Sequence, residues 1–146
     1  MRDVLQYFDL IASVIESSVA ADTVEVNFDR ADAVNGTVDG VLYFHDGSRL
    51  EFTEVVAIKQ PHPVKLSYRY QYVRAGTEIF RYDNAKHHPG LSNYPHHKHI
   101  GGKIVSAIEP MLSQVLDEVS ALLVETASES PSPPKRRRQR RNPKSR

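Results

Sequence analysis

Hydrophobic residues recur at helical spacing near both ends of the chain. Between residues 3 and 19 the apolar stripe consists of Val4, Leu5, Phe8, Ile11, Ala12, Ile15 and Val19, the spacing of an amphipathic helix that faces a core. Asp3 stands where an N-cap residue is expected. A second helix is predicted from Pro110, a residue that suits a first helical turn, to about Leu123. Its apolar positions are Met111, Leu112, Val115, Leu116, Val119, Leu122 and Leu123.

Between these helices the apolar positions alternate, which is typical of half-buried strands. The alternating positions are Val24, Val26 and Phe28, then Val38, Leu42 and Phe44, then Leu50, Phe52, Val56 and Ile58. Asp46-Gly47 predicts a hairpin turn between the second and third runs. Pro61 and Pro63 are predicted to interrupt the sheet, because proline cannot donate to the hydrogen-bond ladder.

Residues 64–73 and 77–83 predict a second hairpin. One face of its first strand carries Val64, Leu66, Tyr68, Tyr70 and Tyr72, and the other carries Lys65, Ser67, Arg69 and Gln71. The polar face of the second strand carries either Arg81 or Tyr82, because a slip of one residue exchanges them. Residues 84–102, rich in Pro, Gly and Asn, predict a functional loop. The predicted fold class is α+β: an N-terminal helix, about five antiparallel strands, this histidine-rich loop and a C-terminal helix.

The composition changes near the C-terminus. Residues 1–126 are predicted to form a single domain, and residues 127–146 a disordered tail, first rich in Pro and Ser and then in Lys and Arg. Residues 1–58 are acidic, with 3 Lys/Arg and 11 Asp/Glu, whereas residues 59–103 are basic, with 8 Lys/Arg and 2 Asp/Glu. Residues 104–130 contain no Lys/Arg and 5 Asp/Glu, and residues 131–146 contain 8 Lys/Arg and no Asp/Glu. The two basic regions would attract an anionic ligand such as a phosphate backbone. The alternative is that the acidic regions only keep the protein soluble and that the tail has no role.

Several classes of function are excluded. The chain has no cysteine, so disulfides, thiolate catalysis and zinc–sulfur sites are ruled out. No apolar run approaches the roughly 20 residues that span a bilayer, and the first residues do not form a signal peptide. We therefore expect a soluble, cytoplasmic protein without a membrane partner. The sequence contains no Walker A motif, dinucleotide fingerprint or nucleophile elbow, and no cofactor is expected.

The candidate chemistry lies in residues 80–99, which hold five of the seven histidines: His87, His88, His96, His97 and His99. Cleavage of RNA through its own 2′-hydroxyl needs a base, an acid and cations that stabilise the phosphate. Histidine suits both proton roles because its unperturbed pKa is about 6.5. We predict His97 and His99 as the proton-transfer pair, provided that this segment is extended. His88 is the next catalytic candidate, and Lys98 is a cation for the phosphate.

Further nucleic-acid contacts are predicted for the cations Arg81, Arg69 and Lys86 and for the stacking rings of Tyr82 and Tyr94. A metal site is the alternative, with imidazoles and Asp83 as ligands. The histidine spacing matches no zinc motif, and Lys98 would repel a cation, so no metal is assigned. A metal-binding hydrolase and a non-catalytic nucleic-acid-binding module both stay open as alternative functions.

The same stretch resembles the TumE-type toxins of bacterial and archaeal toxin–antitoxin systems. The resemblance is carried by Phe80-Arg81-Tyr82-Asp83-Asn84-Ala85, His87-His88-Pro89 and Pro95-His96-His97-Lys98-His99, with support from Tyr68-Arg69-Tyr70-Gln71-Tyr72 and the helix at residues 110–119. It covers roughly residues 3–123 and departs at Lys86, where a proline is expected, and in the basic tail.

This resemblance implies a small cytoplasmic toxin that is paired with a DNA-binding antitoxin. It makes Asp83, Asn84, His87 and His96 further site candidates, but it implies no particular mechanism. A helix followed by an antiparallel sheet is also similar to the RelE-type toxin ribonucleases, at the level of fold alone. Together, the residues and the resemblance predict a toxin that acts on RNA.

Overall fold

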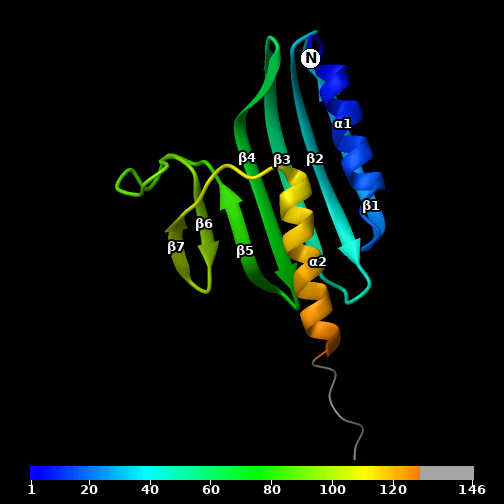
Figure 1. Cartoon of the computed structure of the whole chain (residues 1–146), viewed down its shortest axis with the longest axis vertical. Helices are drawn as coiled ribbons and strands as arrows, with labels where there is room; N and C mark the ends of the chain where they lie inside the picture. The colour runs from blue at the N-terminus through cyan, green and yellow to red at the C-terminus, as the bar shows by residue number, and fades with distance from the viewer. Residues whose placement is uncertain (129–146) are drawn as a thin grey trace, which may run out of the picture.

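The sheet is an antiparallel meander in which each strand pairs with its neighbours along the chain (Figure 1). In the computed structural model, which describes residues 1–128, seven strands are present: β1 (Ala21–Arg30), β2 (Asn35–Phe44), β3 (Arg49–Lys59), β4 (His62–Arg74), β5 (Thr77–Asp83), β6 (His97–Ile100) and β7 (Lys103–Ser106). The α+β class is confirmed, but about five strands was too few. β6 forms inside the stretch of residues 84–102 that was expected to be irregular, and β7 follows directly after it.

Helices α1 (Val4–Glu16) and α2 (Leu112–Ser128) cover one face of the sheet (Figure 1). The Asp3 side chain caps α1 by accepting a hydrogen bond from the Leu5 amide at 2.7 Å, as expected. α2 begins after Pro110 and continues beyond the predicted end at Leu123. Neither of these described helices is long and apolar enough to cross a membrane. The predicted tail beyond residue 128 lies outside the described residues.

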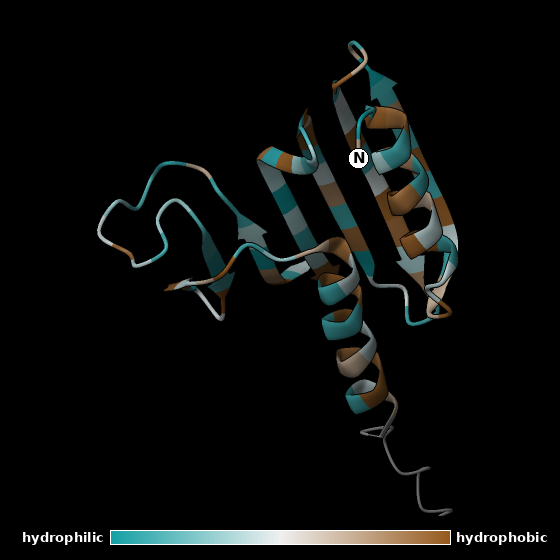
Figure 2. Ribbon diagram, turned by 45° about the horizontal axis from the view of Figure 1, so that its top comes forward, coloured by the Kyte–Doolittle hydropathy of each residue, from teal (hydrophilic) through white to brown (hydrophobic). Residues whose placement is uncertain are grey.

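The hydrophobic core lies between the helices and the sheet. Hydrophobic and hydrophilic residues alternate along the strands (Figure 2), and the hydrophobic positions of the central strands point toward the helices. The buried helical residues are Val4, Tyr7, Phe8, Ile11 and Ile15 of α1 and Leu112, Val115, Leu116, Val119 and Leu123 of α2. Leu5 and Val19 are exposed, so Tyr7 takes the place that the sequence assigned to Leu5. The helix-free side, called the open face below, is predominantly polar.

The prolines do not interrupt the sheet, contrary to the sequence-based prediction. β3 and β4 form a continuous hairpin in which Lys59 pairs with His62 and Ile58 pairs with Pro63. Pro61 lies in the turn and Pro63 near the start of β4. Proline is tolerated at such positions because the ladder does not depend on a central donor there.

A register shift in β4 changes which side chains reach the core. Val55 pairs with Ser67 and Val56 with Lys65, so Leu66 is an extra residue in a β-bulge. As a result Leu66 is 50% exposed, and the Lys65 ammonium donates to the Tyr70 hydroxyl at 2.7 Å. Burial lowers the pKa of Lys65. The predicted two faces of β4 are therefore correct from Ser67 onward and reversed before it.

A buried carboxylate lies close to this bulge. Glu54 of β3 is fully buried, and both of its oxygens accept hydrogen bonds from tyrosine hydroxyls, Tyr7 of α1 and Tyr70 of β4. Burial and the neighbouring Glu54 raise the pKa of both tyrosines. These contacts join α1 to the sheet through hydrogen bonds as well as through apolar packing.

Candidate functional site

The candidate site is assembled by the pairing of β4, β5 and β6. Arg69 pairs with Asp83 and Gln71 with Arg81, while Asp83 and Arg81 pair with His97 and His99 of β6. The register therefore brings Arg81, and not Tyr82, to the open face. Because β6 is extended, His97 and His99 project on the same side, and their ring centroids are 5.0 Å apart.

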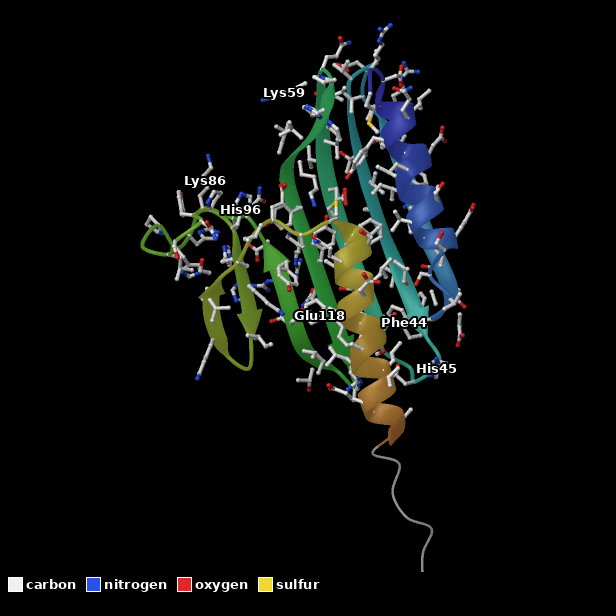
Figure 3. The ribbon with its side chains drawn as sticks, viewed as in Figure 1. Phe44, His45, Lys59, Lys86, His96 and Glu118 are labelled. Carbon is white, nitrogen blue, oxygen red and sulfur yellow. The ribbon has the colours of Figure 1, made fainter. Side chains whose placement is uncertain are left out.

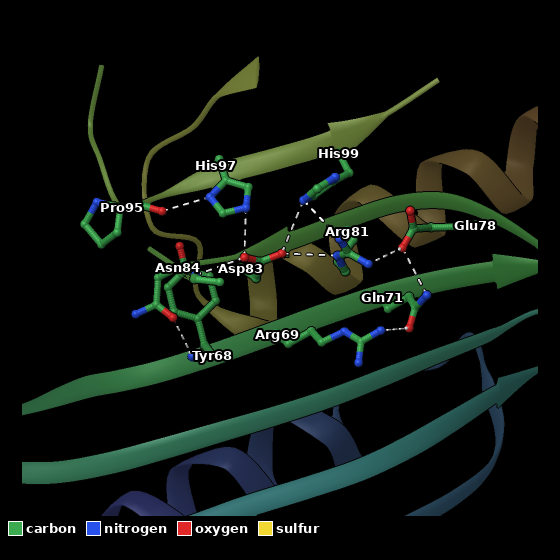
Figure 4. A network of polar contacts seen from close by, with 11 residues as sticks. Tyr68, Arg69, Gln71, Glu78, Arg81, Asp83, Asn84, Pro95, His97 and His99 are labelled. Atoms are coloured by element: carbon green, nitrogen blue, oxygen red, sulfur yellow. Dashed lines mark hydrogen bonds and ion pairs between the residues drawn. The ribbon is translucent and has the colours of Figure 1, made fainter. Parts of the chain in front are cut away.

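Asp83 is the centre of the polar network (Figure 4). Its Oδ1 lies 2.8 Å from His97 Nε2 and accepts a hydrogen bond from the backbone amide of Ala85 at 3.0 Å. Its Oδ2 accepts from Arg81 Nε at 3.1 Å and lies 3.5 Å from His99 Nε2. One nearly buried carboxylate thus holds His97 and Arg81 from two adjacent strands and lies beside His99.

The two nitrogens of His97 both face acceptors. Nδ1 lies 2.8 Å from the Pro95 carbonyl oxygen, and Nε2 lies 2.8 Å from the Asp83 carboxylate (Figure 4). An imidazole can satisfy two acceptors at once only when both nitrogens carry hydrogen, which is the cationic form. His97 is only 2% exposed. His97 is thus buried between the Asp83 carboxylate and the Pro95 carbonyl group, which together fix the orientation of its ring.

His99 has a hydrogen-bond donor, and not an acceptor, as its nearest polar partner. Its Nε2 lies 3.1 Å from Arg81 Nη2, and an arginine can only donate, so this nitrogen carries a lone pair. Burial and then the positive charge of Arg81 lower the pKa of His99 below the ordinary histidine value. At neutral pH it is therefore a neutral imidazole, the form that can accept a proton.

His88 reaches the same place from the segment that joins β5 to β6. Its ring centroid lies 5.2 Å from that of His97 and 6.2 Å from that of His99. Its ring nitrogens make no hydrogen bond to the described residues. The three histidines line a cavity of about 710 Å³ on the open face, together with Arg69, Arg81 and Lys86. Such a volume accommodates a small ligand or part of a polymer.

Two predicted residues lie on the other side of the sheet. Lys98 points toward the helices, where its Nζ lies 2.6 Å from Glu118 Oε1 and 4.7 Å from the centre of the Tyr82 ring. Tyr82 donates its hydroxyl hydrogen to the same carboxylate at 2.9 Å. Figure 3 shows Glu118 on α2, away from the segment that carries Lys86 and His96. The structure does not bring Lys98 or Tyr82 to the histidine cavity.

The remaining motif residues surround the cavity. Asn84 binds the chain itself, since it accepts from the Tyr68 amide at 3.0 Å and donates to the Leu66 carbonyl at 3.2 Å. His96 stacks on Tyr68, with its Nδ1 2.8 Å from the hydroxyl. His87 lines the cavity and is exposed. Tyr94 is exposed but is not among the cavity-lining residues.

The sequence did not indicate two of the partners in this network. Glu78 Oε1 accepts hydrogen bonds from Arg81 at 3.3 Å and from Gln71 at 3.0 Å, and Pro95 contributes only its backbone oxygen. The central position of Asp83 was also not predicted. The available signal was the spacing of Arg81 and Asp83, since residues two apart in a strand share a face.

The three histidines also form the one group of potential metal ligands that was found among the described residues, with ring nitrogens within 4.8 Å of one another. Zinc sites with three histidines use such a set. However, both nitrogens of His97 are engaged, and the Arg81 guanidinium lies beside His99. This cation, and not Lys98, opposes the binding of a metal. The arrangement favours an anionic ligand over a cationic one.

These features define a small α+β protein whose helices cover one side of a meander and whose polar site lies on the other. A family model described as Toxin TumE matches residues 8–124, and the chain belongs to this toxin family. Membership makes it a toxin of a toxin–antitoxin module with a cognate antitoxin as its partner. No curated protein and no solved structure matches the chain.

Proposed function

We propose that this toxin is a metal-independent ribonuclease that cleaves RNA by attack of a 2′-hydroxyl on the adjacent phosphate. The observation that carries the proposal is a neutral His99 beside the cationic Arg81, in the same cavity as His88. A proton acceptor, a phosphate-binding cation and a second imidazole are the groups that this reaction requires. The proposed substrate is cytoplasmic RNA.

The proposed pair for proton transfer is His99 and His88. When Arg81 binds the phosphate, it releases the lone pair of His99 Nε2, which takes the proton from the 2′-hydroxyl. The 2′-oxygen then bonds to phosphorus, and the bond from phosphorus to the 5′-oxygen breaks. His88 in its protonated form supplies the proton to that leaving oxygen. This arrangement replaces the pair His97 and His99 that the sequence suggested, because His97 is buried and both of its nitrogens are engaged.

The remaining charges of the cavity support binding of the phosphate. Arg69 and Lys86 lie on the walls of the cavity together with Arg81. Charge near the developing phosphorane oxygens lowers the barrier most when it is already in place before the reaction. Stacking on an RNA base is assigned to Tyr94 alone, since Tyr82 lies beneath Lys98 on the helix side.

Metal dependence tests the proposal. Purified toxin is incubated with RNA in the presence and absence of a chelator, and the products are examined for 2′,3′-cyclic phosphate ends. The proposal expects equal cleavage in both and cyclic ends throughout. Cleavage that is lost with the chelator and restored by one metal would instead support a metal-binding hydrolase, the second candidate, which the 4.8 Å grouping of the three histidines favours.

A third outcome separates catalysis from binding. A non-catalytic nucleic-acid-binding module would bind RNA without cleaving it, and growth would not change when it is expressed without the antitoxin. RNA that stays intact with wild-type protein and with His99→Ala, at equal RNA affinity, would exclude the ribonuclease.

A further inference from the structure

The helix layer carries a second candidate surface on the side of the sheet opposite the histidine cavity. α1 and α2 lie on the same face (Figure 1), and two hollows of about 280 Å³ and 390 Å³ are lined by residues of both helices. Val14 of α1 and Ser113 of α2 line both hollows. The hollows therefore adjoin one another, and we call them together the α1–α2 groove.

Large hydrophobic side chains border the groove without being covered. Leu10 of α1 is 47% exposed and Met111, directly before α2, is 60% exposed; both line the smaller hollow. Val19 lines the larger one and is also exposed. Hydrophobic side chains that gather around a concave surface typically mark a site of interaction with another molecule.

The charge around the groove limits which partner fits. α1 and α2 contain five acidic residues and no Lys or Arg: Asp9, Glu16, Asp117, Glu118 and Glu125. Glu109 and Asp117 line the groove itself. The one basic residue in its lining, Lys65, donates to Tyr70 and to the Pro110 carbonyl oxygen. A matching partner therefore has hydrophobic side chains together with positive charges.

This requirement excludes two other occupants. RNA is an anion without aliphatic side chains, so the acidic helix layer repels it. The chain's own residues 135–146 supply eight positive charges but no large hydrophobic side chain that could fill the hollows. An amphipathic segment of another protein meets both conditions, because hydrophobic residues at helical spacing can enter a groove while basic residues lie beside them.

We propose that the α1–α2 groove binds an amphipathic segment of the cognate antitoxin, with hydrophobic residues on one side and Lys or Arg next to them. Because the chain belongs to a toxin family, its partner is a cognate antitoxin, and the proposal does not depend on the ribonuclease chemistry. The groove and the histidine cavity lie on opposite faces of the sheet. The antitoxin contact made here therefore leaves the histidines themselves uncovered.

Substitutions that place a positive charge in the groove test the proposal. Leu10→Lys and Met111→Lys alter exposed side chains and are expected to fold, which circular dichroism checks. Val24→Lys is the matched control, because Val24 is 41% exposed and lies on β1, on a different side of α1. The dissociation constant of purified toxin and purified cognate antitoxin is measured by calorimetry. The dissociation constant for the antitoxin is expected to rise by roughly tenfold or more in both groove variants. The control is expected to bind the antitoxin as tightly as wild type does.

Growth assays give a second readout. Leu10→Lys is expected to arrest growth even when the antitoxin is co-expressed, whereas wild type and Val24→Lys are neutralised. Unchanged antitoxin affinity in both groove variants would overturn the proposal. So would a change in the toxin's own oligomeric state with unchanged antitoxin affinity, which would make the groove a contact between toxin copies. Because the affinity is measured directly, a wild-type toxin that leaves RNA intact would contradict only the ribonuclease proposal.

Discussion

Three consecutive residues of β6 lie in two different environments. His97 and His99 project from the open face toward Asp83 and the cavity, whereas Lys98 between them projects toward Glu118 and the helices. Neighbours in sequence are thus separated by the thickness of the sheet. A run of polar residues in a strand thus divides into a site half, which faces the cavity, and a structural half, which faces the helices.

The two halves use their charges differently. On the open face the Asp83 carboxylate binds His97 and Arg81 and lies beside His99, next to a cavity that a ligand can enter. On the helix side Lys98 and Glu118 form an ion pair, with the Lys98 ammonium over the Tyr82 ring. Burial lowers the pKa of Lys98, and the hydrogen bonds to Glu118 and Tyr82 raise it, with a net rise. The first group is suited to exchange protons and the second to hold α2 on the sheet.

The largest expected effect comes from removing the proposed base. His99→Ala is expected to lower the rate of RNA cleavage by roughly 10² to 10⁴-fold, the usual contribution of a general base. The measurement is single-turnover cleavage of a short RNA. Lys98→Met is the control, because it alters the adjacent residue on the other face and is expected to cleave at the wild-type rate. Equal losses in both variants would contradict the division into two halves.

Asp83→Asn is expected to have the next largest effect. The amide lacks the negative charge that lies beside His97 and Arg81, and its nitrogen cannot accept their hydrogen bonds. A loss of roughly 10²-fold in cleavage is expected, because a displacement of about 1 Å near a catalytic group can cost this much. The free energy of unfolding should fall by about 1 to 3 kcal/mol, because buried donors lose a charged acceptor. Denaturant unfolding checks the stability, and wild-type stability would show that Asp83 does not hold these side chains in place.

Lys98→Met is expected to act on stability instead. Loss of the pair leaves the partly buried Glu118 carboxylate with only the Tyr82 hydroxyl as donor, so the free energy of unfolding should fall by about 1 kcal/mol. The midpoint of chemical denaturation measures this change. Glu118→Gln removes the same ion pair from α2 and serves as the matched partner variant. If Lys98→Met, Glu118→Gln and the double variant all lose the same free energy of unfolding, the two residues act as one pair.

The smallest expected effect is the shift of the pH profile in Arg81→Gln, which accompanies the loss of rate from removing the phosphate-binding cation. Cleavage needs His99 without its proton, so the rate rises with pH through the pKa of this histidine. Burial and Arg81 hold that pKa below its ordinary value of about 6.5. Removing the positive charge of Arg81 should raise the pKa of His99 and so move the acidic limb of the profile to higher pH. A limb that moves to lower pH would exclude His99 as the base.

Much of the fold could be predicted from the sequence because the core positions follow simple periods. The capped first helix, the Val38–Phe44 alternation and the Tyr68–Tyr72 face were all evident. The errors have local causes. A single extra residue at Leu66 reverses the faces before it, so Lys65 turns inward. The prolines lie at a hairpin end, which a strand pattern alone does not distinguish from an interruption.

The sequence indicated where the candidate site lies along the chain, but not which side chains meet in it. Five clustered histidines marked the region, and the condition that His97 and His99 share a face was stated correctly for an extended segment. Which of Arg81 and Tyr82 joins them depends on pairing with β4, and a slip of one residue has no local signal. The same holds for Lys98: its role follows from Glu118, which lies on a helix 20 residues further along the chain.

The order of the strands has a consequence for synthesis of the toxin. Every strand of the meander pairs with the one made immediately before it, so the sheet can grow in step with the emerging chain, and only short loops need to close. Arg81 and Asp83 are synthesised with β5, whereas their histidine partners are synthesised later, with β6. Fragments that end before His97 therefore contain most of the scaffold and lack the polar network. Under the proposed ribonuclease mechanism, such fragments lack the base His99 and are expected not to cleave RNA.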